Sequence, residues 1–282
     1  MTGGLWREAL EALRQDRLAV TCAALLAVMS LAAVLGPSLL QYRFDEIDWA
    51  HMAVPPLAES GHWLGTDRLG RDLLVRTLHG LRVSLAIALA ATFVALVIGV
   101  AWGAFAGFRR GRTDALMMRF VDVLYSLPQV FFVIILTVVF GRGPLTILVA
   151  IGAFGWLTMA RIVRGQALAL RERDFVEAAV VGGASTGRIV MRHIVPNLLG
   201  PVIVYATLTL PQVILVESFL SFLGIGIQEP LASLGNLIAD GAADMETAPW
   251  ILAVPAACLM LLVFCFNFLG DSLRDALDPS DR

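Results

Sequence analysis

Lysine is absent from this chain, and all 21 basic residues among its 282 are arginine. A nucleotide-binding P-loop needs a lysine that reaches the β- and γ-phosphates, so the chain has no Walker A motif. The metalloprotease pattern H-E-x-x-H is missing as well. We therefore expect a non-catalytic chain that binds no cofactor of its own.

Candidate metal ligands are few. Three cysteines lie in apolar runs without C-x-x-C spacing, which favours small buried side chains over a disulfide framework: Cys22, Cys258 and Cys265. Four histidines are scattered, and no two stand at metal-binding spacing in the sequence: His51, His62, His79 and His193. We therefore predict no metal site.

Charge is also scarce, at 16% of residues, whereas a soluble domain usually carries about 25%. Hydrophobic residues make up 58%, and the mean hydropathy is +0.79. A chain this apolar must place much of its surface in lipid. The net charge of −2 does not suggest a nucleic-acid partner.

Apolar runs long enough to cross a bilayer occur six times. They cover residues 18–40, 83–107, 119–140, 144–163, 199–222 and 249–270. The first run is too long for the core of a signal peptide, so we expect it to be retained as a span.

Arginine is distributed unequally between the connecting segments. Fifteen of the 21 arginines fall in segments 1–17, 108–119, 161–198 and 271–282, and the other six fall in the alternate segments. Because cytoplasmic loops carry the excess of basic residues, this predicts that both termini are cytoplasmic.

Glycine and proline predict how the spans pack and bend. Gly99, Gly103 and Gly107 stand four apart, which lets two helix backbones approach closely. Prolines inside three of the spans favour kinks, which suit a moving pore but also occur in static bundles: Pro128, Pro201, Pro211 and Pro255.

The outer segment 41–82 is polar and broken by proline in its first part. Thr66 or Asp67 can cap a following helix. That helix has leucines near one face and charges off it, which predicts an amphipathic elbow lying on the membrane before the second span.

The segment 164–198 is the longest predicted cytoplasmic loop. Its first part predicts a helix that ends at Val181, before a turn at Gly182-Gly183, and a second helix follows over about 185–193. Small residues and one aromatic share a face of the first helix: Phe175, Ala178, Ala179 and Gly182. That face fits a groove in another protein, and the alternative is an ordinary solvated hairpin.

Ionisable and amide side chains inside spans are candidates for a translocation path or gate. We select Asp122, Glu217 and Asn267. Glu217 could face the path and meet a peptide amino terminus, or it could pair with an arginine or helix-end donors and hold the bundle together.

The cytoplasmic loop resembles the EAA loop of ABC importer permeases. Glu177-Ala178-Ala179, then Gly183, and later Ile194-Val195-Pro196-Asn197 carry the resemblance. Segments 62–72, 217–226 and 266–279 are similar to peptide and nickel permeases, and 228–231 looks most like the C-type subunit of oligopeptide permeases. The resemblance covers nearly the whole chain.

The resemblance implies an all-α membrane protein with six transmembrane helices and a type I ABC importer (MetI-like) permease fold. The expected organisation is a first span with its flanking segments over 1–81, a permease domain over 82–271 that contains the coupling loop 164–198, and a cytoplasmic tail over 272–282. The chain is expected in the bacterial inner membrane.

It further implies partners. A second, similar permease chain completes the pore, two ABC ATPase subunits hold ATP and magnesium, and an extracytoplasmic solute-binding protein delivers a peptide. The residues implied to contact an ATPase are Phe175, Glu177, Ala178, Ala179, Gly183, Ile194, Pro196 and Asn197. Two alternatives stay open: dipeptides, nickel complexes or another small solute as cargo, and an ion-driven secondary transporter, for which the expected mid-span carboxylates and inverted halves are not evident.

Overall fold

A computed structural model describes residues 2–58 and 61–277. Within those residues the regular secondary structure is helical, apart from one isolated β-bridge between Thr66 and Asp72. The helices are α1 (Thr2–Gln15), α2 (Arg17–Leu39), α3 (Leu73–Arg109), α4 (Gly111–Tyr125), α5 (Gln129–Phe140), α6 (Pro144–Arg171), α7 (Asp174–Val181), α8 (Thr186–Ile189), the π-helical turn η1 (Val190–Ile194), α9 (Val195–Phe222), α10 (Leu234–Ala243) and α11 (Pro249–Leu277).

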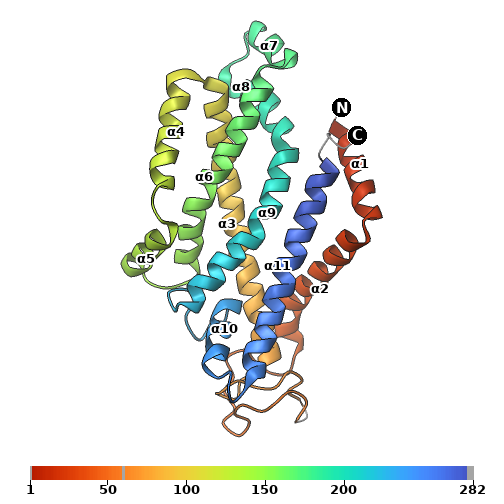
Figure 1. Cartoon of the computed structure of the whole chain (residues 1–282), viewed down its shortest axis with the longest axis vertical. Coiled ribbons are helices and arrows are strands. Elements are labelled where there is room, and N and C mark those ends of the chain that lie inside the picture. Colours follow the sequence, from red (N-terminus) through yellow and green to blue (C-terminus); the bar gives the residue numbers. More distant parts are fainter. Residues whose placement is uncertain (1, 59–60, 278–282) are drawn as a thin grey trace.

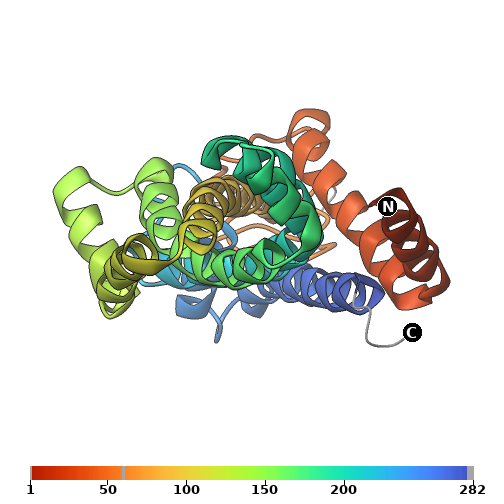
Figure 2. The same ribbon diagram turned by 90° about the horizontal axis from the view of Figure 1, so that it is seen from above.

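The long helices form one elongated bundle (Figure 1). One end, which we call the α7 end, carries α7, the start of α1 and the last turns of α11. The other, the α10 end, carries α10 and residues 40–58 and 61–72. Seen from above, α3, α6 and α9 form the central group, and α1 and α2 lie to one side (Figure 2). The last residues of the predicted tail, 278–282, lie outside the described residues.

Among the described residues, five helices are long and apolar enough to span a membrane, and the number is six if one bent pair is counted as a span. That pair is α4 and α5, which meet at 77°. The predicted third span 119–140 is therefore divided between two helices at a sharp bend. It breaks before Pro128, which cannot donate a backbone hydrogen bond, and its helical part begins earlier, at Gly111. Pro201, Pro211 and Pro255 lie inside continuous helices.

The predicted membrane-lying elbow is wrong. Residues 73–109 form one helix of 37 residues, and Asp72 caps it by accepting a hydrogen bond from the Val75 amide at 2.9 Å. Its first turns are buried on several sides, so they leave no amphipathic face for lipid. The expected boundary after residue 81 falls inside this helix.

The close helix–helix contact that the glycine spacing predicted is present, and it joins α3 to α6. A Cβ atom at Gly103 would lie 2.9 Å from the Arg164 nitrogen, and one at Gly107 would lie 2.7 Å from the Arg164 carbonyl oxygen. Both distances are too short for a carbon atom, so only glycine permits this approach of the two backbones.

The segment 223–248, expected as a loop, contains α10. The Ser233 hydroxyl accepts from the Asn236 amide, and the Asn236 side chain accepts from the Ser233 amide, which forms a capping box. Leu234 is fully buried against the main core. The helix thus closes the bundle at its α10 end.

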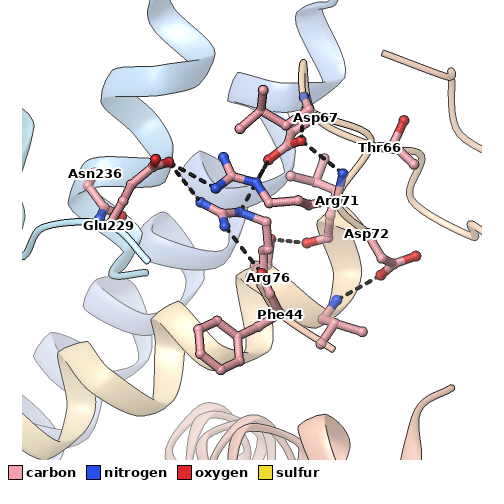
Figure 3. Close-up of polar contacts among 12 residues, drawn as sticks. Phe44, Thr66, Asp67, Arg71, Asp72, Arg76, Glu229 and Asn236 are labelled. Carbon is pink, nitrogen blue, oxygen red and sulfur yellow. Dashed lines mark hydrogen bonds and ion pairs between the residues drawn. The ribbon is translucent and has the colours of Figure 1, made fainter. Parts of the chain in front are cut away.

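Two arginines and two carboxylates hold the α10 end together (Figure 3). Arg71 Nε donates to Asp67 Oδ2 at 2.6 Å, and the fully buried Arg76 lies 3.3 Å from the same oxygen. Glu229 Oε1 lies 3.0 Å from Arg71 Nη1 and 3.8 Å from Arg76 Nη2. Burial alone would lower the pKa of Arg71. The carboxylates of Asp67 and Glu229 raise it by more, so this pKa lies above its ordinary value. The network joins the outer segment, α3 and the loop before α10.

Replacing Gly103 by leucine is expected to destabilise the chain, because the side chain would collide with the α6 backbone. Overpacking of this kind costs about 1–3 kcal/mol. The measurement is the thermal unfolding midpoint of the purified protein in detergent. Gly165→Leu is the matched control, since a Cβ atom at this helical glycine meets nothing within 4 Å. Equal midpoints for the two variants would contradict the role of the contact.

Replacing Asp67 by asparagine is expected to lower stability by about 3–5 kcal/mol, because it leaves buried guanidinium groups without their main partner. Asp45→Asn in the same outer segment removes a pair with the exposed Arg43 and is expected to cost less than about 1 kcal/mol. Chemical denaturation of both variants in detergent tests this difference. Similar losses of stability in the two variants would contradict the prediction that the buried ion pairs contribute more than an exposed one.

Candidate functional site: a docking helix and a cavity

Helix α7 is the terminal feature of its end of the bundle (Figure 1). Asp174 and Glu177 lie in its first turn, where carboxylates favour the helix dipole. It ends in a Schellman motif, in which Ala184 N donates to Ala179 O at 3.1 Å and Gly183 N donates to Val180 O at 3.0 Å. Gly183 has φ +75°, a backbone conformation that side chains disfavour. The predicted helix and turn are thus confirmed.

One face of α7 packs inward. Val176 is fully buried, and Ala179 is partly buried against the same cluster. This α7-end cluster also includes buried residues from α3, α6 and α8 to α9, namely Ala104, Phe108, Met159, Val163, Ala167, Ile189, Val190, Ile194, Leu198 and Val202. Helix α7 is therefore attached to the main helices by an apolar contact.

The other face of α7 is exposed and largely apolar. Phe175 is 41% exposed, Val180 52% and Val181 83%, and Glu177 and Ala178 lie exposed beside them. Val180 and Val181 were not among the predicted contact residues. The signal for them was the apolar pair directly before Gly182, where the helix ends and both side chains project from its tip. An exposed apolar group of this kind is typical of an interaction surface.

The second half of the predicted motif, at residues 194–197, has both buried and exposed members. Ile194 is fully buried in the α7-end cluster, so it supports the loop and presents nothing to a partner, contrary to our prediction. Pro196 and Asn197 are exposed, and the Asn197 side chain donates to the His193 carbonyl at 2.7 Å. The Phe175 ring lies 6.4 Å from the His193 ring, which brings the two parts of the motif near each other.

A cavity of about 500 Å³ opens between the α4–α5 break, α6 and α9. Its lining is aromatic, aliphatic, hydroxyl and amide in character, without a charged side chain: Tyr125, Leu127, Gln129, Ile151, Phe154, Gly155, Thr158, Met159, Tyr205, Leu208, Thr209, Gln212, Val213 and Val216. Sequence analysis did not locate it, because its lining depends on the bend at Pro128 and on which faces of α6 and α9 meet.

Asp122 lies beside this cavity and does not line it. Arg161 Nη2 donates to Asp122 Oδ1 at 2.9 Å, and the Arg161 guanidinium lies 4.0 Å from the centre of the Tyr125 ring. The arginine therefore neutralises Asp122 and orients a tyrosine that does line the cavity.

Glu217 is fully buried, as in the alternative in which it holds the bundle together and faces no path. Its carboxylate accepts hydrogen bonds from Ser84 of α3 at 2.7 Å and from Ser221 at 2.8 Å. The Leu234 amide of α10 donates to the Ser84 hydroxyl at 3.3 Å. The partners of this carboxylate are hydroxyl groups, where the sequence suggested an arginine or helix-end donors, and the contacts link three helices.

Asn267 is exposed on α11 and donates to the Val263 carbonyl of its own helix at 2.9 Å. The three predicted path residues therefore do not form one site. Among the described residues, one histidine and carboxylate group is close enough together to hold a metal ion, and it consists of Asp48, His51 and His62 at the α10 end.

Comparisons with known proteins agree with this geometry. A family model described as "Binding-protein-dependent transport system inner membrane component" matches residues 99–280. A second, described as "N-terminal TM domain of oligopeptide transport permease C", matches residues 4–56. Between them they cover the first span, the last part of α3 and all helices from α4 to α11.

Similar curated proteins extend over nearly the whole chain. The oligopeptide transport system permease protein OppC of Escherichia coli strain K12 is 53% identical over 278 residues, which cover 99% of this chain and 92% of that protein. OppC of Bacillus subtilis strain 168 is 43% identical over 278 residues, covering 99% and 90%. The dipeptide transport system permease protein DppC of the same organism is 43% identical over 282 residues, covering 100% and 86%.

A solved structure with a similar fold is the inward-facing MetNI methionine ABC transporter, with a TM-score of 0.58 and 23% identity. The match covers 72% of this chain and 96% of that one, and it confirms the predicted type I importer fold. The family models and the sequence identities together show that this chain belongs to the binding-protein-dependent inner-membrane transport permeases, in the oligopeptide permease C group.

Proposed function

We propose that this chain forms half of the pore of an ATP-driven oligopeptide importer and that the exposed face of α7 receives an ATP-hydrolysing partner subunit. The proposal rests on how α7 is linked to the cavity. Helix α7 is attached to α6 and to the start of α9, and the same two helices line the cavity. A second, similar permease chain would complete the pore, and a solute-binding protein would deliver the cargo from the opposite side.

The orientation follows from charge and from the position of α7. Most arginines lie in segments that the fold places at the α7 end, together with the described ends of the chain. By the positive-inside rule that end is cytoplasmic, where ATP is available. Segment 40–72 and α10 then lie outside the cytoplasm, where a solute-binding protein can reach them.

Movement of α7 can reach the cavity without an intervening flexible segment. Val176 is fully buried in the α7-end cluster, so a push on α7 displaces the adjoining ends of α6 and α9. Packed interiors transmit such displacements because they have low compressibility. Closure of the ATPase pair would thus change the access of the cavity from one side of the membrane to the other.

An oligopeptide is the cargo favoured by the relatives and compatible with the cavity. Hydroxyl and amide groups of Tyr125, Thr158, Tyr205 and Gln212 can form hydrogen bonds with a peptide backbone, which is common to all sequences. The absence of a charged group from the lining avoids selection by side-chain charge.

Replacing Ala178 by arginine is expected to prevent the ATPase from binding while leaving the permease folded, because Ala178 is exposed on α7. Loss of an interface anchor typically weakens binding by about tenfold or more. The measurement is co-purification of ATPase and second permease with the tagged chain in mild detergent, together with peptide uptake. Glu11→Arg adds an arginine to an exposed position of α1 and serves as the control.

Retention of the ATPase by Ala178→Arg would contradict the docking proposal. A wild-type chain that purifies alone and transports peptide without any ATPase would favour the ion-driven alternative.

Replacing Thr158 by tryptophan is expected to reduce peptide uptake strongly while the complex still assembles. The added indole would occupy space in the cavity, since a tryptophan side chain buries roughly 150–250 Å². Leu89→Trp is the control, because Leu89 is 55% exposed on α3 and does not line the cavity. Uptake and ATPase co-purification are measured for both variants. Normal uptake by Thr158→Trp would exclude this cavity as part of the path.

A further inference from the structure

We propose that Asp48, His51 and His62 form a binding site for a divalent first-row transition metal ion at the α10 end of the bundle. Each side chain offers one ligand atom, and these atoms lie within 4.8 Å of one another. Ligand atoms around a tetrahedral zinc ion are roughly 3.3 Å apart. Small rotations of the side chains are enough to close this difference.

The donor set selects the class of ion. Two imidazoles with one carboxylate suit Zn²⁺, Ni²⁺, Co²⁺ or Cu²⁺, whereas Mg²⁺ and Ca²⁺ prefer oxygen ligands alone. Three protein ligands leave a coordination position open for water.

The environment of His62 matches that of a metal-binding histidine. Its Nδ1 atom lies 2.9 Å from Asp72 Oδ2, and both side chains are buried. The other ring nitrogen is therefore the one directed to an ion, as in the carboxylate–histidine–metal arrangement. Asp72 Oδ1 also accepts from the Val75 amide at 2.9 Å, so the start of α3 holds this pair in place.

The remaining two ligands are adjacent and reachable from solvent. His51 Nδ1 lies 2.7 Å from Asp48 Oδ2, and their side chains are 35% and 39% exposed. A metal ion can replace the proton that these two groups share, because metal binding releases protons from its ligands.

The backbone that carries these ligands is well supported. The Thr66 hydroxyl donates to the His51 carbonyl at 2.6 Å and accepts from the Val54 amide at 2.8 Å. Gly70, with φ +76°, packs so closely on Asp48 that a Cβ atom would overlap the Asp48 carbonyl. The site is therefore positioned by contacts independent of the ligands, which lowers the cost of binding an ion.

Titration of the full-length, metal-stripped chain in detergent tests the proposal. The chain is purified through a tag without histidine, Co²⁺ binding is followed by its visible absorption, and Zn²⁺ is then added as competitor. We expect one equivalent of Co²⁺ per chain, displaced by Zn²⁺, and a higher unfolding temperature with Zn²⁺. His51→Gln and Asp48→Asn are expected to bind at least tenfold more weakly and to lose that thermal shift.

His193→Gln is the matched control, because this histidine lies at the α7 end and is expected to leave Co²⁺ binding unchanged. His62→Gln tests the buried ligand. If His62→Gln does not fold, Co²⁺ binding by the wild-type chain is compared with binding by His51→Gln, because His51 is partly exposed. The proposal is overturned if wild-type binding is no tighter than that of His51→Gln, or if His193→Gln loses the signal.

Discussion

The close approach of α3 and α6 is the constraint on which the rest of this structure depends. Gly103 and Gly107 let the two backbones meet, and a side chain at either position would separate them. In lipid there is little hydrophobic force between helices, so tight packing must hold such a pair. Once α3 and α6 are joined, the other spans have a fixed surface to pack on, and α6 carries α7 at one end and the cavity along its side.

The two ends of the bundle differ in the interactions that hold their outermost segments. At the α10 end, buried Arg71 and Arg76 form ion pairs with the buried Asp67 and the exposed Glu229, and buried Glu217 accepts from serine hydroxyls. Such groups are costly to separate, so they favour one arrangement. At the α7 end an ion pair between Arg164 and Asp114 joins α6 to α4, whereas α7 itself is attached by an apolar contact in which Val176 is buried. An apolar attachment can shift without leaving a charge unpaired, which fits the docking of an ATPase on α7 that we propose.

The sequence predicted features that depend on local pattern. Apolar runs indicated the spans, Pro128 indicated a break, and Gly182-Gly183 indicated the end of α7, because each acts within a few residues. The motif at Glu177-Ala178-Ala179 predicted a helix at the tip of the molecule, and the comparisons place the chain in the family that this motif indicated.

Only the tertiary structure decided where polar side chains point. Glu217 faces Ser84 of α3 and Ser221 of its own helix, and Ile194 lies inside the cluster that supports α7. His51 and His62 stand eleven positions apart without a metal-binding pattern, yet the folded outer segment brings them together with Asp48. Local sequence thus determined which segments are helices in the membrane, because hydropathy and backbone chemistry act at short range. The partners of each buried polar group depended on contacts between distant segments, which no local pattern contains.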